Sequence, residues 1–187
     1  LKRFDFIWLR HMKSNLFKQV NSGLVLLIVI VAIARLVPHP FGVSPDGALG
    51  LFSGAHIKHR WALVIPVIAM LLGDLILGLY AAPVMAAVYF GFLTTVLVGR
   101  FTLAKKRTPL RYCVAVIAGA VSFYLISNIG MWYVAFPRTL DGLIACYIQG
   151  LPFLLRTLGG DFIYSILMFG GYEWFQQWKT TKSAVAV

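Results

Sequence analysis

The sequence predicts an all-α membrane protein with six transmembrane helices. Hydrophobic residues make up 60% of the 187 residues and charged residues only 12%, about half the charged share of a soluble domain. Because a helix needs about 20 apolar residues to cross the bilayer, this content is enough for about five or six crossings. The net charge of +11 is then read as an orientation signal, and we expect no nucleic-acid partner.

Residues 1–21 alternate aromatic and basic side chains, among them Phe4, Trp8, Arg10 and Lys18. We expect a cytoplasmic amphipathic segment whose basic side chains face anionic lipid headgroups. The segment is too charged and too long for the positive end of a signal peptide, so we expect no cleaved signal.

A short helix is predicted to run from Pro45, at the first helical position, to about Ile57. Ser44 is placed to cap it, and Asp46 faces the positive end of the helix dipole. Gly50 and Gly54 form a G-x-x-x-G pattern, which allows close approach to neighbouring helices. We therefore expect this helix to be buried. The remaining apolar runs predict spans at 22–37, 61–80, 83–104, 112–135 and 161–178.

Residues 138–156 are apolar but interrupted by Gly142, Gly150 and Pro152. We expect an outer loop or a re-entrant helix here, because a seventh crossing would move the basic C-terminal tail, 179–187, to the outer side.

The predicted organisation is a six-helix transmembrane domain, 22–178, between the segment 1–21 and the tail 179–187, with both termini cytoplasmic. Positively charged residues favour the cytoplasmic side of a membrane protein. In this arrangement all but three of the 17 bases are cytoplasmic, and the exceptions are Arg35, Arg138 and Arg156.

Ionisable side chains at membrane depth are costly and mark functional sites. Asp74 lies about 20 Å and Asn128 about 25 Å along their spans from the cytoplasmic start, which places both toward the outer side. Helical spacing puts Asn128 on one face between two aromatic residues. We predict an outer substrate cavity lined by Asp74, Tyr124, Asn128, Trp132, Asp161 and Tyr164, with Asp46 and Arg138 at its mouth.

Simpler interpretations stay open: the aromatic side chains would form an interfacial belt, and Asp74 and Asn128 would bridge helices. Cys146 lies in the outer segment 138–156, where a soft thiolate ligand would reach the metal of a bound cofactor.

Four runs carry a family resemblance: HPFGVSPDGALGLFSGAHI, AMLLGDLILG, SNIGMW and FPRTLDGLIACYIQGLPFLLRTLGGDFIYSILMFGG. Over residues 22–175 the chain resembles an uncharacterised family of small bacterial integral membrane proteins, which is itself similar to the S components of energy-coupling-factor (ECF) vitamin transporters. S components are substrate-binding subunits. The resemblance implies that the six helices form an S-component-like bundle. It also implies a multi-pass protein of the bacterial inner membrane that takes up a vitamin-like molecule. It also implies an outer cavity closed by the loops 36–44, 79–83 and 136–158.

The first span, GLVLLIVIVAIARLV, lacks the A-x-x-x-A pattern with which S components dock on a shared energising module. In this respect the chain resembles the solitary cobalamin importers, which implies a cobalamin-type compound as the bound substrate. The sequence has no nucleotide-binding P-loop, so an ATPase that drives uptake would be another chain.

Two other functions compete with uptake. The stretch LGGDFIYS is similar to the G-x-G-D motif of intramembrane aspartyl proteases, with Asp161 and Asp74 as the dyad, but Leu158 stands where that motif needs glycine. Alternatively, small-residue helix faces are typical of a structural subunit in a larger membrane complex. We expect a binding protein and not an enzyme.

Overall fold

The computed structural model describes residues 33, 43–57 and 61–185, and every secondary-structure element within these ranges is helical. The all-α prediction is confirmed. The predicted segment 1–21 and, apart from Ile33, the predicted first span at 22–37 lie outside the described residues. The helices, in chain order, are α3 (Asp46–His56), α4 (Trp61–Leu77), α5 (Ala82–Leu103), α6 (Pro109–Ala135) and α7 (Leu140–Val185).

Three of these helices contain a segment long and apolar enough to cross a membrane: all of α5, all of α6 and Leu140–Trp178 of α7. The 22 residues of α5 extend about 33 Å at the helical rise, close to the thickness of the bilayer core. The apolar helix α4 is shorter. Together these helices indicate a multi-pass membrane protein.

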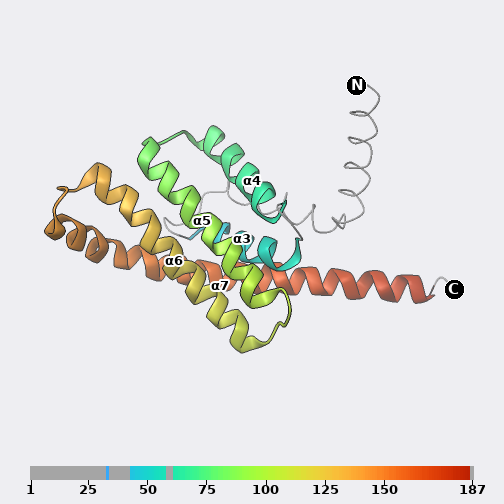
Figure 1. Ribbon diagram of the computed structural model, residues 1–187. Coiled ribbons are helices and arrows are strands. Elements are labelled where there is room, and N and C mark those ends of the chain that lie inside the picture. The colour runs from blue at the N-terminus through green and yellow to red at the C-terminus, as the bar shows by residue number, and fades with distance from the viewer. Residues whose placement is uncertain (1–32, 34–42, 58–60, 186–187) are drawn as a thin grey trace, which may run out of the picture.

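The three long helices follow one another through two tight connections, so that α5 and α6, and then α6 and α7, run antiparallel (Figure 1). At the first connection the side chain of Thr108 caps α6 by accepting a hydrogen bond from the backbone N–H of Arg111, at 3.4 Å. Pro109 occupies the first turn, where its missing N–H costs no helical hydrogen bond.

Helix α7 differs from our prediction of an outer loop or re-entrant helix at 138–156 and a separate last span at 161–178. In the structure a single helix of 46 residues covers Leu140–Val185, with Pro152 inside it. A proline removes one backbone hydrogen bond from a helix interior, and neighbouring helices make that loss tolerable at membrane depth. The interrupting residues therefore do not end the helix, whose far end extends beyond the other helices (Figure 1).

Helix α3 lies between α5 and α7 in the interior of the bundle (Figure 1), and eight of its eleven residues are buried. This confirms the predicted short buried helix. Glycines on both helices allow close packing of α3 on α5. A side chain at Gly54 of α3 would overlap the backbone of Val96 and Arg100, and one at Gly99 of α5 would overlap the backbone of Leu51.

The ends of α3 are not capped as we predicted. Pro45 occupies the N-cap position and no local side chain bonds to the helix start, so the expected cap by Ser44 is wrong. At the other end, Arg107 donates to the carbonyls of Ala55 and Leu103, both at 3.4 Å. A positive charge at a helix C-terminus interacts favourably with the helix dipole. Both ends of α3 therefore depend on partners distant in sequence.

Substituting Gly54→Ala should destabilise the protein by about 1–3 kcal/mol, because the new methyl group meets backbone atoms that cannot move aside. Gly170→Ala is the matched control, since open space surrounds this exposed helical glycine. The control should be unchanged or up to about 1 kcal/mol more stable. Thermal unfolding in detergent micelles measures both, and equal stability of the two variants would contradict the close packing of α3 on α5.

Candidate functional site

A cavity of about 600 Å³ lies among α4, α5, α6 and α7 and reaches the N-terminus of α3. Its volume is within the range of about 300–1,000 Å³ found for small-molecule sites. Tyr80 and Ala81, at the connection between α4 and α5, line one end together with Val134 of α6. Thr95 and Asp161 line the other end, deeper in the bundle.

The walls of the cavity are mainly apolar. Helix α5 contributes residues at helical spacings of three and four, namely Ala81 at its N-cap, then Val84, Val88, Phe92 and Thr95. The other walls come from aromatic and aliphatic side chains of α4, α6 and α7: Met70, Phe123, Met131, Val134 and Phe153. Such a surface matches a ligand with an apolar body.

Asp161 of α7 is a buried carboxylate in the wall of the cavity, with 2% of its surface exposed. Its carboxylate accepts a hydrogen bond from the backbone N–H of Ala48, the third residue of α3. Asp161 thus takes the capping role that Ser44 lacks. Gly47 makes this possible, because a side chain at that position would overlap the carboxylate.

A second carboxylate, that of Asp46, lines the same end of the cavity and repels Asp161 electrostatically. The Oδ1 atom of Asp161 is buried and has no hydrogen-bond partner among the described residues. Two acidic groups and one unused acceptor therefore lie where the apolar walls end.

Of the predicted site residues, Asp46 and Asp161 line this cavity, and Asp46 lies beside Asp161 at the inner end and not at the mouth, where we expected it. Three others, Tyr124, Asn128 and Cys146, lie together between α6 and α7. The hydroxyl of Tyr124 donates to the carbonyl of Tyr147, and the side-chain amide of Asn128 donates to the carbonyl of Tyr124 at 2.8 Å. The Sγ atom of Cys146 lies 3.5 Å from the carbonyl oxygen of Asn128. These residues hold two helices together.

Trp132 and Arg138 stabilise the connection between α6 and α7. The indole nitrogen of Trp132 donates to the carbonyl of Pro137 at 3.0 Å. The guanidinium carbon of Arg138 lies 4.0 Å from the ring centroid of Tyr133, a cation–π contact. Tyr164, half-buried on α7, packs against the core around α3.

Asp74 of α4 is 3% exposed, and its Oδ2 atom accepts a hydrogen bond from the hydroxyl of Tyr89 on α5 at 2.8 Å. This bond bridges α4 and α5, which is the simpler role that we left open for Asp74. The proposed protease pairing of Asp74 with Asp161 has no support in these contacts, because Asp161 lies against Asp46 and Ala48.

Sequence reasoning missed most of the cavity wall. Val88 and Phe92 of α5 have the spacing of residues on one helix face. In a membrane helix such an apolar face can meet lipid as well as a cavity, so the spacing alone does not identify the cavity wall. Thr95 gave a weak polar signal within the predicted span 83–104. Its hydroxyl donates to the carbonyl of Phe92 at 2.7 Å. The glycine in SPDG, Gly47, is the signal that points to a close approach at this end of the cavity.

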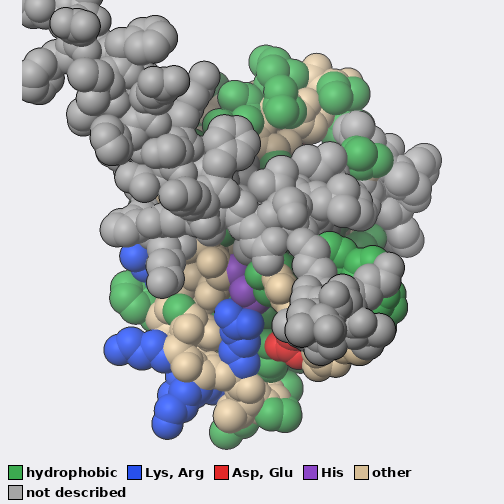
Figure 2. Space-filling model, turned by 90° about the vertical axis from the view of Figure 1, so that its right-hand side faces the viewer, with side chains coloured by type: hydrophobic (Ala, Val, Ile, Leu, Met, Phe, Trp, Pro, Cys, Tyr) green, Lys and Arg blue, Asp and Glu red, His purple; other side chains and the backbone are tan. Residues whose placement is uncertain are grey.

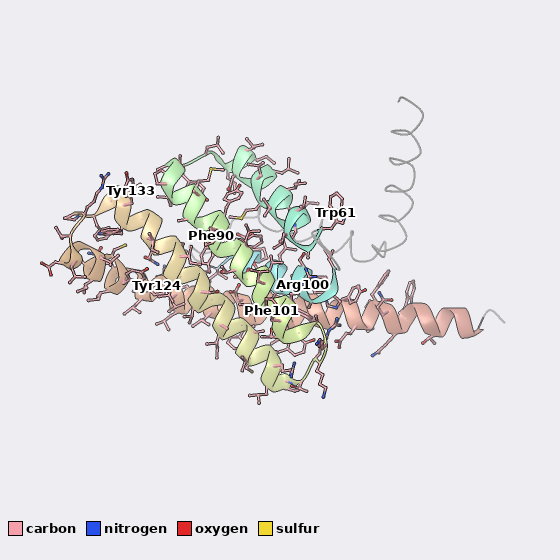
Figure 3. The ribbon with its side chains drawn as sticks, viewed as in Figure 1. Trp61, Phe90, Arg100, Phe101, Tyr124 and Tyr133 are labelled. Carbon is pink, nitrogen blue, oxygen red and sulfur yellow. The ribbon has the colours of Figure 1, made fainter. Side chains whose placement is uncertain are left out.

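The two ends of the bundle differ in charge. Figure 2 shows Lys and Arg side chains gathered on the lower part of one end, and the exposed bases around the α5–α6 connection are Arg100, Lys105, Lys106, Arg107 and Arg111. Tyr133 lies at the opposite end of the bundle from Arg100 (Figure 3). The lining residues Ala81 and Val134 belong to the Tyr133 end, away from this basic cluster.

In the described part of the chain, no group of three His, Cys, Asp or Glu side chains lies close enough together to hold a metal ion. Cys146 is buried and is not among the described residues that line the cavity. Its predicted role as a ligand to a cofactor metal stays a prediction.

A family of unknown function, DUF6580, matches residues 16–184. The chain belongs to this family. No curated protein and no solved structure matches it. The function of this family is unknown, so the geometry of the cavity is the basis for a function of this chain. The likeness of the family to S components stays a prediction.

Substituting Tyr89→Phe should destabilise the protein by about 1–3 kcal/mol, because the buried carboxylate of Asp74 loses a hydrogen-bond donor. Tyr133→Phe, at an exposed position on α6, keeps the ring under Arg138 and should leave stability unchanged. Thermal unfolding of both purified variants checks this. Equal unfolding temperatures for the two variants would show that the bond does not stabilise the bundle.

Proposed function

We propose that the chain is a membrane-embedded substrate-binding protein that takes up a vitamin-like small molecule from the outer side. The observation that supports this most is the cavity of about 600 Å³ with apolar walls and two carboxylates at its inner end. A few convergent polar groups in an apolar cavity between helices are typical of small-molecule sites.

The charge distribution supports an outward-facing cavity. Bases are enriched on the cytoplasmic side of membrane proteins, and the exposed bases from Arg100 to Arg111 lie at the end away from Tyr80 and Ala81. We propose six spans with both termini in the cytoplasm: the predicted span at 22–37, α3, α4, α5, α6 and α7. With an inner-membrane location, the cavity then faces the periplasmic side.

The resemblance to S components favours binding and uptake over catalysis. An ATPase or other energising module on a separate chain would drive release to the cytoplasm. Because the chain lacks the A-x-x-x-A pattern, it resembles the solitary cobalamin importers, and this resemblance implies a cobalamin-type compound as the substrate. The cavity volume favours a drug-sized ligand, smaller than an intact cobalamin.

The second candidate function is a structural subunit of a larger membrane complex. Many large apolar side chains are exposed on α4 and α7, including Leu72, Ile76, Leu155 and Ile166. In a membrane protein such side chains face lipid or another chain equally well. The cavity distinguishes the two functions, because a purely structural subunit has no need of a bound small molecule.

A bound molecule should be detected by native mass spectrometry of the purified full chain, at about one per protein. Val88→Trp places an indole inside the cavity, so the bound fraction should fall at least about tenfold. Val114→Trp, on an exposed face of α6, is the control and should keep the ligand. Co-purification with other subunits and no bound molecule in the wild-type chain would favour the structural function.

The orientation is tested with single cysteines in a variant that lacks Cys113 and Cys146. Thr139→Cys, exposed in the α6–α7 connection, should react with a membrane-impermeant maleimide from the periplasmic side. Ala104→Cys, exposed in the α5–α6 connection, should react only after the membrane is permeabilised. The reverse pattern would place the end of the cavity that is lined by Tyr80 and Val134 on the cytoplasmic side. That result would contradict uptake from outside.

A further inference from the structure

The carboxylate of Asp161 is incompletely satisfied within the described structure. Only 2% of the residue is exposed, and Oδ1 has no hydrogen-bond partner while the backbone N–H of Ala48 bonds to the same carboxylate. A buried acceptor without a donor costs about 1–3 kcal/mol, and more when it is charged. Asp161 also lines the cavity, which places this carboxylate between α3 and the space that a ligand would occupy.

The charged groups near Asp161 indicate which kind of hydrogen-bond donor a ligand would carry. Asp46 lines the same end of the cavity and adds a second negative charge. Among the described lining residues there is no Lys, Arg or His. The N-terminus of α3 contributes about half of an elementary positive charge, so among the described lining residues the carboxylates of Asp46 and Asp161 are the ionisable groups at this end.

We propose that the cavity binds an organic cation, with a protonated nitrogen at Asp161 and an apolar body along the α5 wall. This assignment rests on the proposed function and specifies its substrate class. The nitrogen donates to Oδ1 of Asp161 and lies within the field of Asp46. A positive charge between the two carboxylates offsets their mutual repulsion, and a hydrogen bond between charged groups is about twice as strong as a neutral one.

The walls account for the rest of the ligand. Phe92, Phe123 and Phe153 come from three different helices and line one volume with Val88 and Met131. Aromatic side chains suit both a flat apolar group and a nearby cationic one, because the ring faces attract positive charge. A bare metal ion would leave this apolar surface unused. The ligand is therefore expected to be an amine with an aromatic or aliphatic body.

The test compares three indoles of similar shape and different charge on the purified full chain: cationic tryptamine, neutral tryptophol and anionic indole-3-acetate. Binding is measured by thermal stabilisation in detergent at fixed sodium concentration. Tryptamine should bind most tightly. Asp161→Asn should weaken tryptamine at least about tenfold, since a hydrogen bond to a charged group contributes about 1.5–3 kcal/mol, and should remove the preference for the cation.

Asp141→Asn is the matched control, because Asp141 lies exposed in the first turn of the same helix, and it should bind as the wild type does. If Asp161→Asn does not fold, Asp46→Asn provides the second variant. Asp46 is only half-buried, and this change should weaken tryptamine several-fold and leave tryptophol unaffected. Equal binding of all three indoles, tighter binding of the anion, or a preference that survives in the Asp161 and Asp46 variants would overturn the proposal.

Mass spectrometry of the molecule that co-purifies separates this proposal from the proposed function. A released compound with a basic nitrogen, absent from the Asp161→Asn protein, would support the proposal even if no indole fits. A released neutral or acidic compound would overturn the cation assignment and leave the uptake function standing. No released molecule and no binding of any indole would overturn both.

Discussion

The structure depends on holding one short helix inside the bundle. Eight of the eleven residues of α3 are buried, and within the described chain no local side chain caps its N-terminus. Asp161 accepts from Ala48 at the N-terminus, and Arg107 donates to Ala55 at the C-terminus. The two charges have the signs that the helix dipole favours at each end. Asp161 belongs to α7 and Arg107 to the α5–α6 connection, so both contacts form only when these later segments are in place.

This arrangement also sets the depth of the cavity. Helix α3 covers about 16 Å at the helical rise, roughly half of the bilayer core, and it packs alongside the part of α5 from Thr95 to Arg100. The other half of the bundle is left for the cavity, which stops where α3 begins. The carboxylate that caps the helix is also the acceptor in the cavity. A ligand that bonds to Asp161 would therefore stabilise the helix that forms this end of its own site.

Several predictions succeeded because they depend on properties of short stretches. The Gly50 and Gly54 pair and the helix start around Asp46 marked α3 as a buried helix, and the structure confirms it. The prediction for 138–156 failed because Gly142, Gly150 and Pro152 weaken a helix locally, whereas packing against α6 keeps α7 continuous. Gly150 even serves that packing, since a side chain there would come within 2.7 Å of the Asn128 side-chain oxygen.

The sequence by itself determined that the chain lies in a membrane, that its helices are apolar on several faces, and that its bases gather at one end. Hydropathy and charge act residue by residue, so they can be read along the chain. Only the tertiary structure decided which face of each helix meets the cavity, a neighbouring helix or lipid. Tyr124 and Asn128 have the spacing of a site, yet they join α6 to α7. Asp46 and Asp161 come together across 115 positions because α3 is buried against α7, and no pattern within either segment contains that pairing.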